Sequence, residues 1–305
     1  MKKQFKFFYL LSAVTFFFGS CEKETLDPLT PPTADAGSFQ TVQLPTNNVS
    51  LTGSGTTTNG NIVGYLWSLI SGPNQPIIES PSSPTTKLKS LIDGTYTFQF
   101  AVTDAAGLTG MDTVSILVKA PIQHTITLQP ANNTMGGHAD SYNLVGGTGG
   151  TELPIGSWTI NGTPTNWRSF VQFDQSQIPA NSTIIEATLY LYSAPNPILG
   201  NGDAQYGTAN AFYIERITGN WTGATLNWNA LPATTTEHRV LVPKSGSTTE
   251  NISVNVKDIV QDMTNATNQG FAFRLQNETP LNIRVFASSF NSNATLRPKL
   301  VITYQ

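Results

Sequence analysis

The sequence predicts an all-β protein made of two successive β-sandwiches, the second of which carries one short helix. Apolar and polar residues alternate in short runs along residues 36–118 and again along 124–304, which is the pattern of strands with one buried face. Clusters of Gly, Asn, Asp and Pro separate these runs and mark turns. Only 11% of the 305 residues are charged, against roughly 25% in average soluble proteins, and this favours an extracellular β-rich protein.

The amino terminus has the composition of a secretory signal peptide. Three lysines precede an apolar run over residues 7–18, and the small pair Gly19-Ser20 ends the segment. The apolar run is too short to cross a bilayer comfortably. We therefore expect residues 1–20 to be removed and the remainder of the chain to be secreted.

The only cysteine of the chain, Cys21, directly follows this segment. Its position resembles the lipobox of bacterial lipoproteins, in which the thiol is lipidated and becomes the first mature residue; the alternative is an ordinary cleavage site. Residues 22–24, Glu-Lys-Glu, resemble the tag that sends Bacteroidetes lipoproteins to the outer face of the outer membrane. The resemblance implies a lipid anchor at Cys21 in the cell outer membrane, followed by a proline-containing tether over residues 21–35.

The mature chain is acidic and cannot form an internal disulfide. Removal of Lys2, Lys3 and Lys6 leaves 13 basic and 19 acidic groups. The sequence therefore has no basic footprint for nucleic acid. Because there is a single cysteine, each domain depends on sheet packing for its stability.

Residues 36–119 are predicted to form the first sandwich. Leu-Thr-Gly-Ser-Gly at 51–55, Tyr-Leu-Trp at 65–67 and Val-Thr-Asp-Ala-Ala-Gly at 102–107 follow the order of a PKD domain, which the segment resembles. The resemblance implies an immunoglobulin-like β-sandwich that serves as a spacer or adhesion module on cell surfaces. We expect Trp67 to fill the core between its two sheets.

The second sandwich is predicted over residues 122–305. Apolar residues fall on one parity in the segments 169–173, 187–191 and 271–275, as in strands that pack one face against a core. Residues 256–264 instead carry apolar side chains at helical spacing. This segment is therefore predicted to form one short helix against the sandwich.

The order of these segments resembles the DNRLRE, or disaggregatase-related, domain, which is close to carbohydrate-binding module family 96. Matching segments include Arg-Ser-Phe at 168–170, Ala-Thr-Leu-Tyr-Leu-Tyr at 187–192 and Arg-Pro-Lys-Leu-Val-Ile-Thr-Tyr at 297–304. The chain departs from the pattern at Gly223-Ala224, where relatives usually have an acidic residue after Trp-Thr. The resemblance implies a jelly-roll β-sandwich that binds polysaccharide, with acidic glycans such as alginate among its targets.

All six arginines of the chain lie in this second domain. A guanidinium fork matches the two oxygens of a carboxylate, as a uronic acid requires, although pairing with Asp and Glu on strand surfaces is the alternative. If Val171, Leu189, Phe273 and Ile283 point into the core, tyrosines and arginines share the opposite face, which is either a sugar platform or covered by a loop or domain. The glycan-binding residues predicted on this face are Arg168, Tyr190, Tyr192, Arg274 and Arg284.

Tryptophans provide two further groups of candidates. Trp158 and Trp167 lie in or beside the Gly/Thr/Asn-rich segment 156–166, which we predict to be an exposed loop, and both are candidates for sugar contact. Trp221 and Trp228 lie among small polar residues in a segment expected to cross the sandwich as a loop. We expect these two side chains to anchor that loop rather than to bind sugar.

The sequence offers little support for catalysis. None of the three histidines has metal-ligand spacing or lies beside a nucleophile in a recognisable motif, and the acidic residues show no pairing typical of glycosidases. His138 and Asp140 are better explained by a turn or by a structural calcium near Asp140. No cofactor is expected to be required, and calcium is the one candidate ion.

These observations together predict a non-catalytic, surface-exposed lipoprotein that binds a polysaccharide through its second domain, with the first domain as spacer. The expected partners are an acidic, alginate-like polysaccharide, the outer membrane, and a glycan importer with degrading enzymes. A structural or adhesion lipoprotein without sugar affinity is the first alternative. A polysaccharide lyase or hydrolase is the second.

Overall fold

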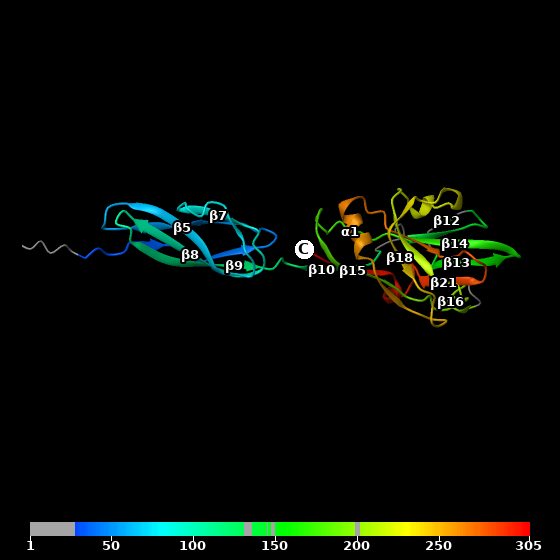
Figure 1. Cartoon of the computed structure of the whole chain (residues 1–305). Coiled ribbons are helices and arrows are strands. Elements are labelled where there is room, and N and C mark those ends of the chain that lie inside the picture. The colour runs from blue at the N-terminus through cyan, green and yellow to red at the C-terminus, as the bar shows by residue number, and fades with distance from the viewer. Residues whose placement is uncertain (1–27, 131–135, 145, 148–149, 199–201) are drawn as a thin grey trace, which may run out of the picture. The chain divides into compact units, whose positions relative to one another are not determined.

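The computed structural model describes residues 28–130, 136–144, 146–147, 150–198 and 202–305 (Figure 1). The chain divides into two compact units, with the boundary between Ala120 and Pro121. The predicted signal peptide, Cys21 and the first part of the predicted tether lie outside the described residues. Within the described part, no helix is long and apolar enough to cross a membrane.

The first unit is a β-sandwich with two main sheets. Its strands are β1 (Thr33–Asp35), β2 (Gln40–Gln43), β3 (Val49–Thr52), β4 (Ser54–Thr56), β5 (Ile62–Ser71), β6 (Ile77–Ile78), β7 (Thr85–Lys89), β8 (Gly94–Asp104) and β9 (Thr109–Lys119). One sheet has the order β2-β9-β8-β5 and the other β3-β7-β6, while β1 and β4 form a separate pair. Strand β2 runs parallel to β9, and the remaining pairs are antiparallel.

Alternate aromatic side chains of the long strands form the core of this unit. Tyr96, Phe98 and Phe100 on β8 have no exposed surface, because every second residue of the strand points between the sheets. Trp67 on β5 is 1% exposed, and its ring centroid lies 4.4 Å from that of Phe100. The prediction for Trp67 is thus confirmed, and the unit is the immunoglobulin-like sandwich expected from the sequence.

The second unit is a larger curled sandwich with one α-helix among the described residues, and it confirms the predicted fold class. Its strands are β10 (His124–Leu128), β11 (Gly136–Asp140), β12 (Gly146–Gly147), β13 (Glu152–Ile160), β14 (Thr163–Val171), β15 (Ile184–Leu191), β16 (Gln205–Tyr206), β17 (Phe212–Ile217), β18 (Thr234–Val242), β19 (Ile252–Asn255), β20 (Phe271–Leu275), β21 (Asn282–Ala287) and β22 (Lys299–Tyr304). Its helices are α1 (Lys257–Asn265) and the 3-10 turns η2 (Gly223–Thr225), η3 (Trp228–Ala230) and η4 (Ala294–Leu296).

Two sheets of unequal size make up this sandwich. The large sheet has the order β16-β21-β13-β14-β20-β17-β18, with β11 paired to β14 and β12 to β11. The small sheet has the order β10-β22-β15-β19. The edge strands β18 and β19 therefore belong to different sheets, and helix α1 follows directly after β19.

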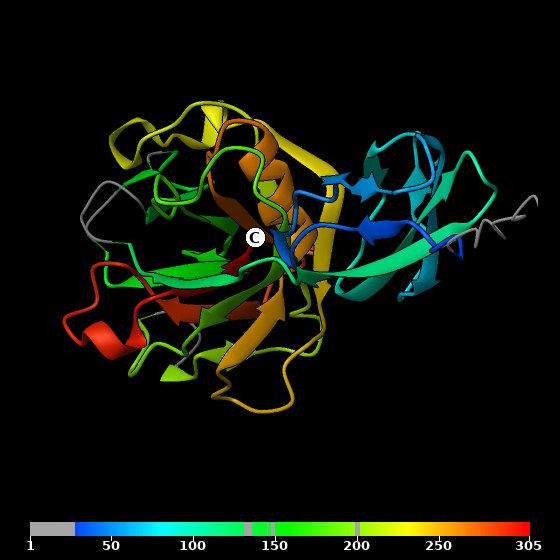
Figure 2. The same cartoon turned by 90° about the vertical axis from the view of Figure 1, so that its left-hand side faces the viewer.

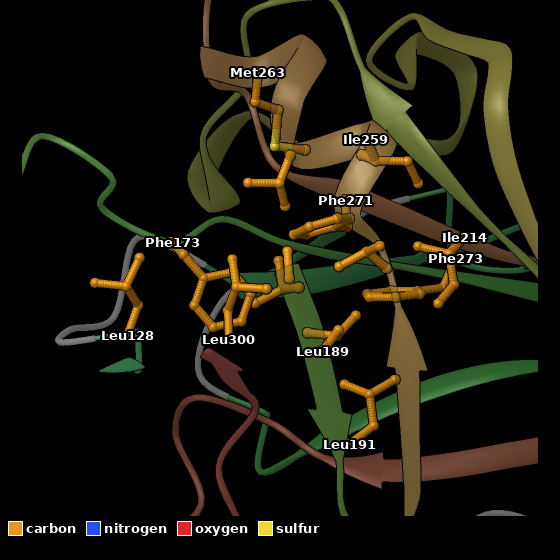
Figure 3. Packing of buried hydrophobic residues seen from close by; sticks show 14 of the residues in the cluster. Leu128, Phe173, Leu189, Leu191, Ile214, Ile259, Met263, Phe271, Phe273 and Leu300 are labelled. Atoms are coloured by element: carbon orange, nitrogen blue, oxygen red, sulfur yellow. The ribbon is translucent and has the colours of Figure 1, made fainter. Parts of the chain in front are cut away.

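The main core of the second unit lies between the sheets and extends onto α1. Leu189 from the small sheet and Phe271 and Phe273 from the large sheet belong to one cluster of buried side chains (Figure 3). Ile259 and Met263 add one face of α1 to this cluster, and burial of each such side chain contributes roughly 2 kcal/mol. The helix begins one residue later than predicted and contacts β15 and β18, so it bridges the two sheets (Figure 2).

Residues 156–166 form the β13–β14 hairpin, and the prediction of a loop there was wrong. Ile160 pairs with Thr163, which leaves a two-residue turn at Asn161 and Gly162 with positive φ angles of 50° and 82°. Asn-Gly is the favoured pair for such turns, because both residues tolerate positive φ and the turn matches the twist of the strands. The polar composition suggested a loop, whereas the Asn-Gly pair was the signal for a hairpin.

Candidate functional site

Four neighbouring strands of the large sheet, β14, β20, β17 and β18, carry charged and aromatic side chains on the face opposite the main core. Phe212 and Ile214 of β17 point into that core, so alternation turns Tyr213 outward. The group, which we call the arginine face, consists of Arg168, Tyr213, Glu215, Arg239 and Arg274.

Tyr213 lies at the centre of the arginine face. Arg274 is its partner in the register of β17 and β20, and Arg239 approaches from β18. The guanidinium carbons of Arg239 and Arg274 lie 4.2 and 5.1 Å from the centroid of the tyrosine ring. Both distances are within the range of cation–π attraction, so two positive charges flank one aromatic ring.

A buried carboxylate fixes the positions of these arginines. The Oε1 atom of Glu215, a residue only 3% exposed, accepts a hydrogen bond from Arg274 Nη2 at 2.7 Å, and its Oε2 accepts one from Arg274 Nε at 3.3 Å. Arg239 Nη1 lies 3.8 Å from the same Oε1. Arg274 Nη1 donates to no protein acceptor among the described residues, so both of its N–H groups remain available to a ligand.

Arg168 presents a second oriented guanidinium group. Its Nε and Nη2 donate to the two carboxylate oxygens of Glu278 at 2.8 and 3.0 Å, and its guanidinium carbon lies 4.9 Å from the ring centroid of Trp228. Arg168 and Arg274 both line a small cavity of about 70 Å³. A liquid water takes about 30 Å³, so this space suits a group of carboxylate size rather than a whole sugar ring.

The cations of the arginine face are more exposed than the carboxylates that pair with them. The side chains of Arg168, Arg239 and Arg274 are 31, 37 and 29% exposed, whereas those of Glu215 and Glu278 are 3 and 22% exposed. Three positive charges also exceed two negative ones. Guanidinium groups beside a tyrosine ring suit an anionic ligand, because the ring holds them by cation–π attraction while they bind a carboxylate.

The structure brings together only part of the predicted glycan-binding set. Arg168 and Arg274 share the arginine face and its cavity. Tyr190 and Tyr192 lie on or next to β15 of the small sheet, where Lys299 Nζ is 4.4 Å from the ring centroid of Tyr190. Tyr190 and these arginines therefore belong to different sheets, and Tyr192 follows the end of β15, where its carbonyl accepts a hydrogen bond from Ala287.

Sequence reasoning missed three residues at this site. Tyr213 could have been found from the alternation Phe-Tyr-Ile-Glu-Arg-Ile over residues 212–217, in which it is an outward position. Arg239 lies on β18, which is exposed along most of its length and shows no clear alternation. Trp228 was expected to be an anchor, and no local pattern indicates its contact with Arg168.

The prediction for Arg284 was wrong, because its side chain is buried inside the second unit. The residue is 1% exposed, and its Nε donates to the side-chain oxygen of Gln205. Its Nη1 donates to the carbonyl of Pro243 and its Nη2 to Glu250, both at 2.9 Å. Burial lowers the pKa of Arg284 to about 10, and Glu250 partly opposes this shift.

The prediction for Arg284 failed because the wrong residues of β21 were assigned to the core-facing side of the strand. Ile283 was expected to point into the main core, but it packs with Val285, Trp158 and Tyr206 in a separate apolar cluster. Phe286 instead joins the main core. Every residue of β21 is buried, so both faces carry apolar side chains and alternation could not identify the inner one.

The expectation that Trp158 and Trp167 are exposed loop residues was also wrong. Trp158 lies on β13, is half-buried, and packs edge-on against Tyr206 with ring centroids 5.0 Å apart. Trp167 lies on β14 and is 4% exposed. Both are strand residues because the segment between them folds as a hairpin.

Trp221 has the anchoring role expected from the sequence. Its Nε1 donates to the carbonyl of Gln269 at 2.6 Å, and its ring centroid lies 5.7 Å from that of Phe170. The backbone N–H groups of Thr218 and Gly219 donate to the carbonyl of Ala233. These hydrogen bonds join the two ends of the segment that carries Trp221, so the segment is a closed loop. The tryptophan therefore fastens this loop to the outer face of the large sheet.

Asp140 forms a turn, which was one of the two alternatives for it. Its Oδ1 accepts hydrogen bonds from the backbone N–H groups of Tyr142 and Asn143 at 3.0 and 2.7 Å. Burial lowers the pKa of His138, and the neighbouring Asp140 charge partly opposes that shift. Among the described residues no three His, Cys, Asp or Glu side chains gather as a metal site, and a calcium near Asp140 stays a prediction.

Comparison with family models assigns both units. The K319L-like PKD domain matches residues 36–118, and carbohydrate-binding module family 96 matches residues 155–304. The chain carries a PKD domain followed by a family 96 carbohydrate-binding module. Both are non-catalytic types of domain, and the arginine face lies within the matched part of the module.

Curated relatives match less than half of the chain. Low-density lipoprotein receptor-related protein 11 of Homo sapiens is 43% identical over 88 residues, which are 29% of this chain and 18% of that protein. Dyslexia-associated protein KIAA0319-like protein of Mus musculus is 33% identical over 135 residues, which are 44% of this chain and 12% of that protein. The chain thus spans less than a fifth of the length of these relatives.

Two solved structures with low TM-scores are similar to this chain. The solution structure of the PKD domain from KIAA 1837 protein is 29% identical, with a TM-score of 0.28, and the match covers 32% of this chain and 93% of that one. A structure of carbohydrate-binding modules from the β-sandwich super family, described for promiscuous specificity, is 14% identical, with a TM-score of 0.25. That match covers 92% of this chain and 93% of that one.

Proposed function

We propose that the carbohydrate-binding module binds an acidic, alginate-like polysaccharide through the arginine face. The placement of Tyr213 between Arg239 and Arg274, with Arg168 on the same side of the sheet, carries this proposal. A uronic acid unit lies beside Tyr213, whose ring holds the two guanidinium groups by cation–π attraction, and directs its carboxylate to Nη1 of Arg274. Arg168 binds the carboxylate of a neighbouring unit.

The buried glutamate improves this site by preorganising it. Glu215 holds Arg274 in position before any ligand arrives, so binding loses less side-chain entropy than it would with a freely rotating arginine. It also reduces the net charge of the face. Affinity for a single uronate is therefore modest, and binding of a polymer gains from contacts made by several units.

We further propose that the protein is a lipoprotein held in the outer membrane through Cys21, exposed at the cell surface, with the PKD domain as a spacer. Its captured polysaccharide would pass to a glycan importer and degrading enzymes. Replacement of the thiol in Cys21→Ser should move the protein from the membrane fraction to the soluble fraction of the producing cells. A variant that stays in the membrane fraction would contradict the lipid anchor.

Calorimetric titration of the purified protein with alginate, pectin and neutral glycans tests the glycan specificity. We expect binding to the acidic polymers and a marked loss of affinity at high salt, because guanidinium–carboxylate contacts between exposed groups are screened. Failure of every acidic polymer to bind would overturn the proposal and leave the adhesion alternative. Release of oligosaccharide products from any polymer would instead establish catalysis.

A further inference from the structure

A second cavity lies in the module between the carboxyl-terminal end of α1 and the segment that follows β14. Its volume is about 510 Å³, within the roughly 300–1,000 Å³ typical of small-molecule sites. We call it the helix-end pocket, and its lining includes Gln172, Asp174, Gln175, Met263, Thr264 and Asn268. None of these residues belongs to the arginine face.

Gln175 is a buried amide with little protein bonding. The residue is 9% exposed, and its side-chain Nε2 makes one weak contact, at 3.7 Å, with the sulfur of Met263. Among the described residues no donor bonds its Oε1. This side chain therefore presents an acceptor and a spare N–H to the pocket that it lines.

Other groups around the pocket are mostly acceptors. Asp174 accepts from the backbone N–H of Ser176 through Oδ1, and these hydrogen bonds hold the pKa of its carboxyl below the usual range. Thr264 donates its hydroxyl proton to the carbonyl of Val260, so only its lone pairs face outward. The last turn of α1 adds carbonyl groups that have no partner further along the helix.

The negative charge of the helix-end pocket disfavours the acidic sugars proposed for the arginine face. Its lining contains no lysine or arginine and one carboxylate, Asp174. An anionic sugar would meet repulsion there and no compensating cation. Hydroxyl groups are the natural complement, because each can donate to a carboxylate, an amide oxygen or a helix carbonyl.

Apolar side chains supply the remaining wall. Ala180 and Ala266 are exposed residues of this wall. Phe173, Ile178 and Met263 also line the pocket but are 0, 8 and 1% exposed, because they belong to the main core (Figure 3 shows Phe173 and Met263). A pyranose ring has hydroxyl groups around its edge and C–H groups on its faces. An apolar wall beside a ring of acceptors fits both parts of such a molecule.

We propose that the helix-end pocket binds a neutral sugar unit, held by hydrogen bonds from its hydroxyl groups to Gln175 and Asp174. The helix-end pocket is separate from the arginine face. Residues of both sites occur along β14 and the segment that follows it. Gln172 follows Arg168 by four residues, a rise of roughly 13 Å in extended chain. A polysaccharide that alternates acidic and neutral units could therefore occupy both.

Calorimetric titration of the purified full chain with gluco-, xylo-, manno- and galacto-disaccharides tests the proposal. We expect the wild-type protein to bind at least one of them. Gln175→Met keeps the side-chain volume but removes both hydrogen-bonding ends, and it should weaken that binding about tenfold. Gln177→Met changes an exposed residue of the same segment that does not line the pocket, and it should bind as the wild type does.

Asp174→Asn provides a second variant in case Gln175→Met unfolds, because an asparagine keeps the oxygen that bonds Ser176 while it removes the charge. It should also weaken binding of the neutral disaccharide. The proposal is overturned if no disaccharide binds the wild-type protein, or if the pocket variants and Gln177→Met bind equally well. Affinity for alginate oligosaccharides should be unchanged in the pocket variants, so a failure here is distinct from a failure of the arginine face.

Discussion

Arg274 and Arg284 lie on two strands of the same sheet, and each forms an ion pair with one glutamate. In the first pair the arginine is the more exposed member, and in the second pair it is the glutamate. At the arginine face the carboxylate of Glu215 is 3% exposed and the side chain of Arg274 is 29% exposed. At the sheet's other region the side chain of Arg284 is 1% exposed and that of Glu250 is 37% exposed. One pair shows its cation to solvent, and the other shows its anion.

This difference teaches that an ion pair does not by itself reveal a binding site. The buried member of each pair is committed to the fold, because separating it from its partner would leave a charge in a poorly solvated place. The exposed member is the one that a ligand can reach. The charge of the ligand that each region attracts therefore depends on which member of the ion pair is exposed. The presence of an arginine alone does not decide it.

The largest effect should follow from removal of the buried cation. Arg284→Met leaves Gln205, the carbonyl of Pro243 and Glu250 without their donor, and we expect a loss of about 3 kcal/mol in the free energy of unfolding. Arg239→Gln, at a side chain 37% exposed, should cost less than about 1 kcal/mol. Urea unfolding of both variants measures the contrast, and equal losses would contradict it.

The next effect concerns affinity rather than stability. Arg274→Lys keeps a positive charge beside Glu215 but loses the guanidinium fork, so alginate affinity should fall about tenfold while the unfolding midpoint stays near that of the wild type. Titration calorimetry and urea unfolding are measured on the same preparation. Unchanged affinity would show that a point charge is sufficient and that the fork has no role.

A smaller effect separates the two sheets. Tyr213→Leu removes the aromatic ring that holds two arginines by cation–π attraction, and it should weaken alginate binding about fivefold, from the usual value of such a contact. Tyr190→Leu makes the same change on the small sheet, where the ring lies beside Lys299, and should leave binding unchanged. The reverse ranking would return the site to the tyrosines predicted from the sequence.

The smallest effect concerns the pH dependence of stability. It compares a buried histidine with an exposed one, whose pKa values are shifted in opposite directions. Burial lowers the pKa of His138, so its neutral form is favoured by folding, and stability falls as the pH drops through its ordinary value of 6.5. A hydrogen bond with Asp262 raises the pKa of the exposed His238, so its contribution is present below 6.5 and lost as the pH rises through the raised value.

Unfolding free energies of His138→Gln and His238→Gln across this pH range check the two directions. The first substitution should reduce the fall in stability on acidification. The second should reduce the loss on alkalinisation. Identical pH profiles for the two variants would contradict the assigned environments.

The fold was largely predictable because period-two alternation is a direct consequence of strand geometry. The long strand β8 buries Tyr96, Phe98 and Phe100 on one side, and the pattern alone identifies them. The short helix was equally visible from its apolar spacing. Alternation failed at β21, where both faces are covered and the inner one has no distinguishing signal.

The candidate site was less predictable because it depends on which strands become neighbours. Arg168, Tyr213 and Arg274 come from three strands that are far apart in the chain and adjacent in the sheet. The sequence placed Arg168 and Arg274 on an outward face but could not join them to Tyr213. It paired them instead with Tyr190, whose strand lies in the other sheet, and with Tyr192, which follows the end of that strand.

The contact between Arg168 and Trp228 gives the protein an optical property of its own. The indole lies under a guanidinium group whose carbon is 4.9 Å from the ring centroid, at the border of the arginine face. A carboxylate that draws Arg168 toward itself would alter the electric field at this ring and so shift its fluorescence. The five tryptophans of the chain include Trp67, whose place in the core of the other unit makes it a constant background. The proposed binding of an acidic ligand at this sheet should therefore change the intrinsic tryptophan fluorescence, and no added label is needed to detect it.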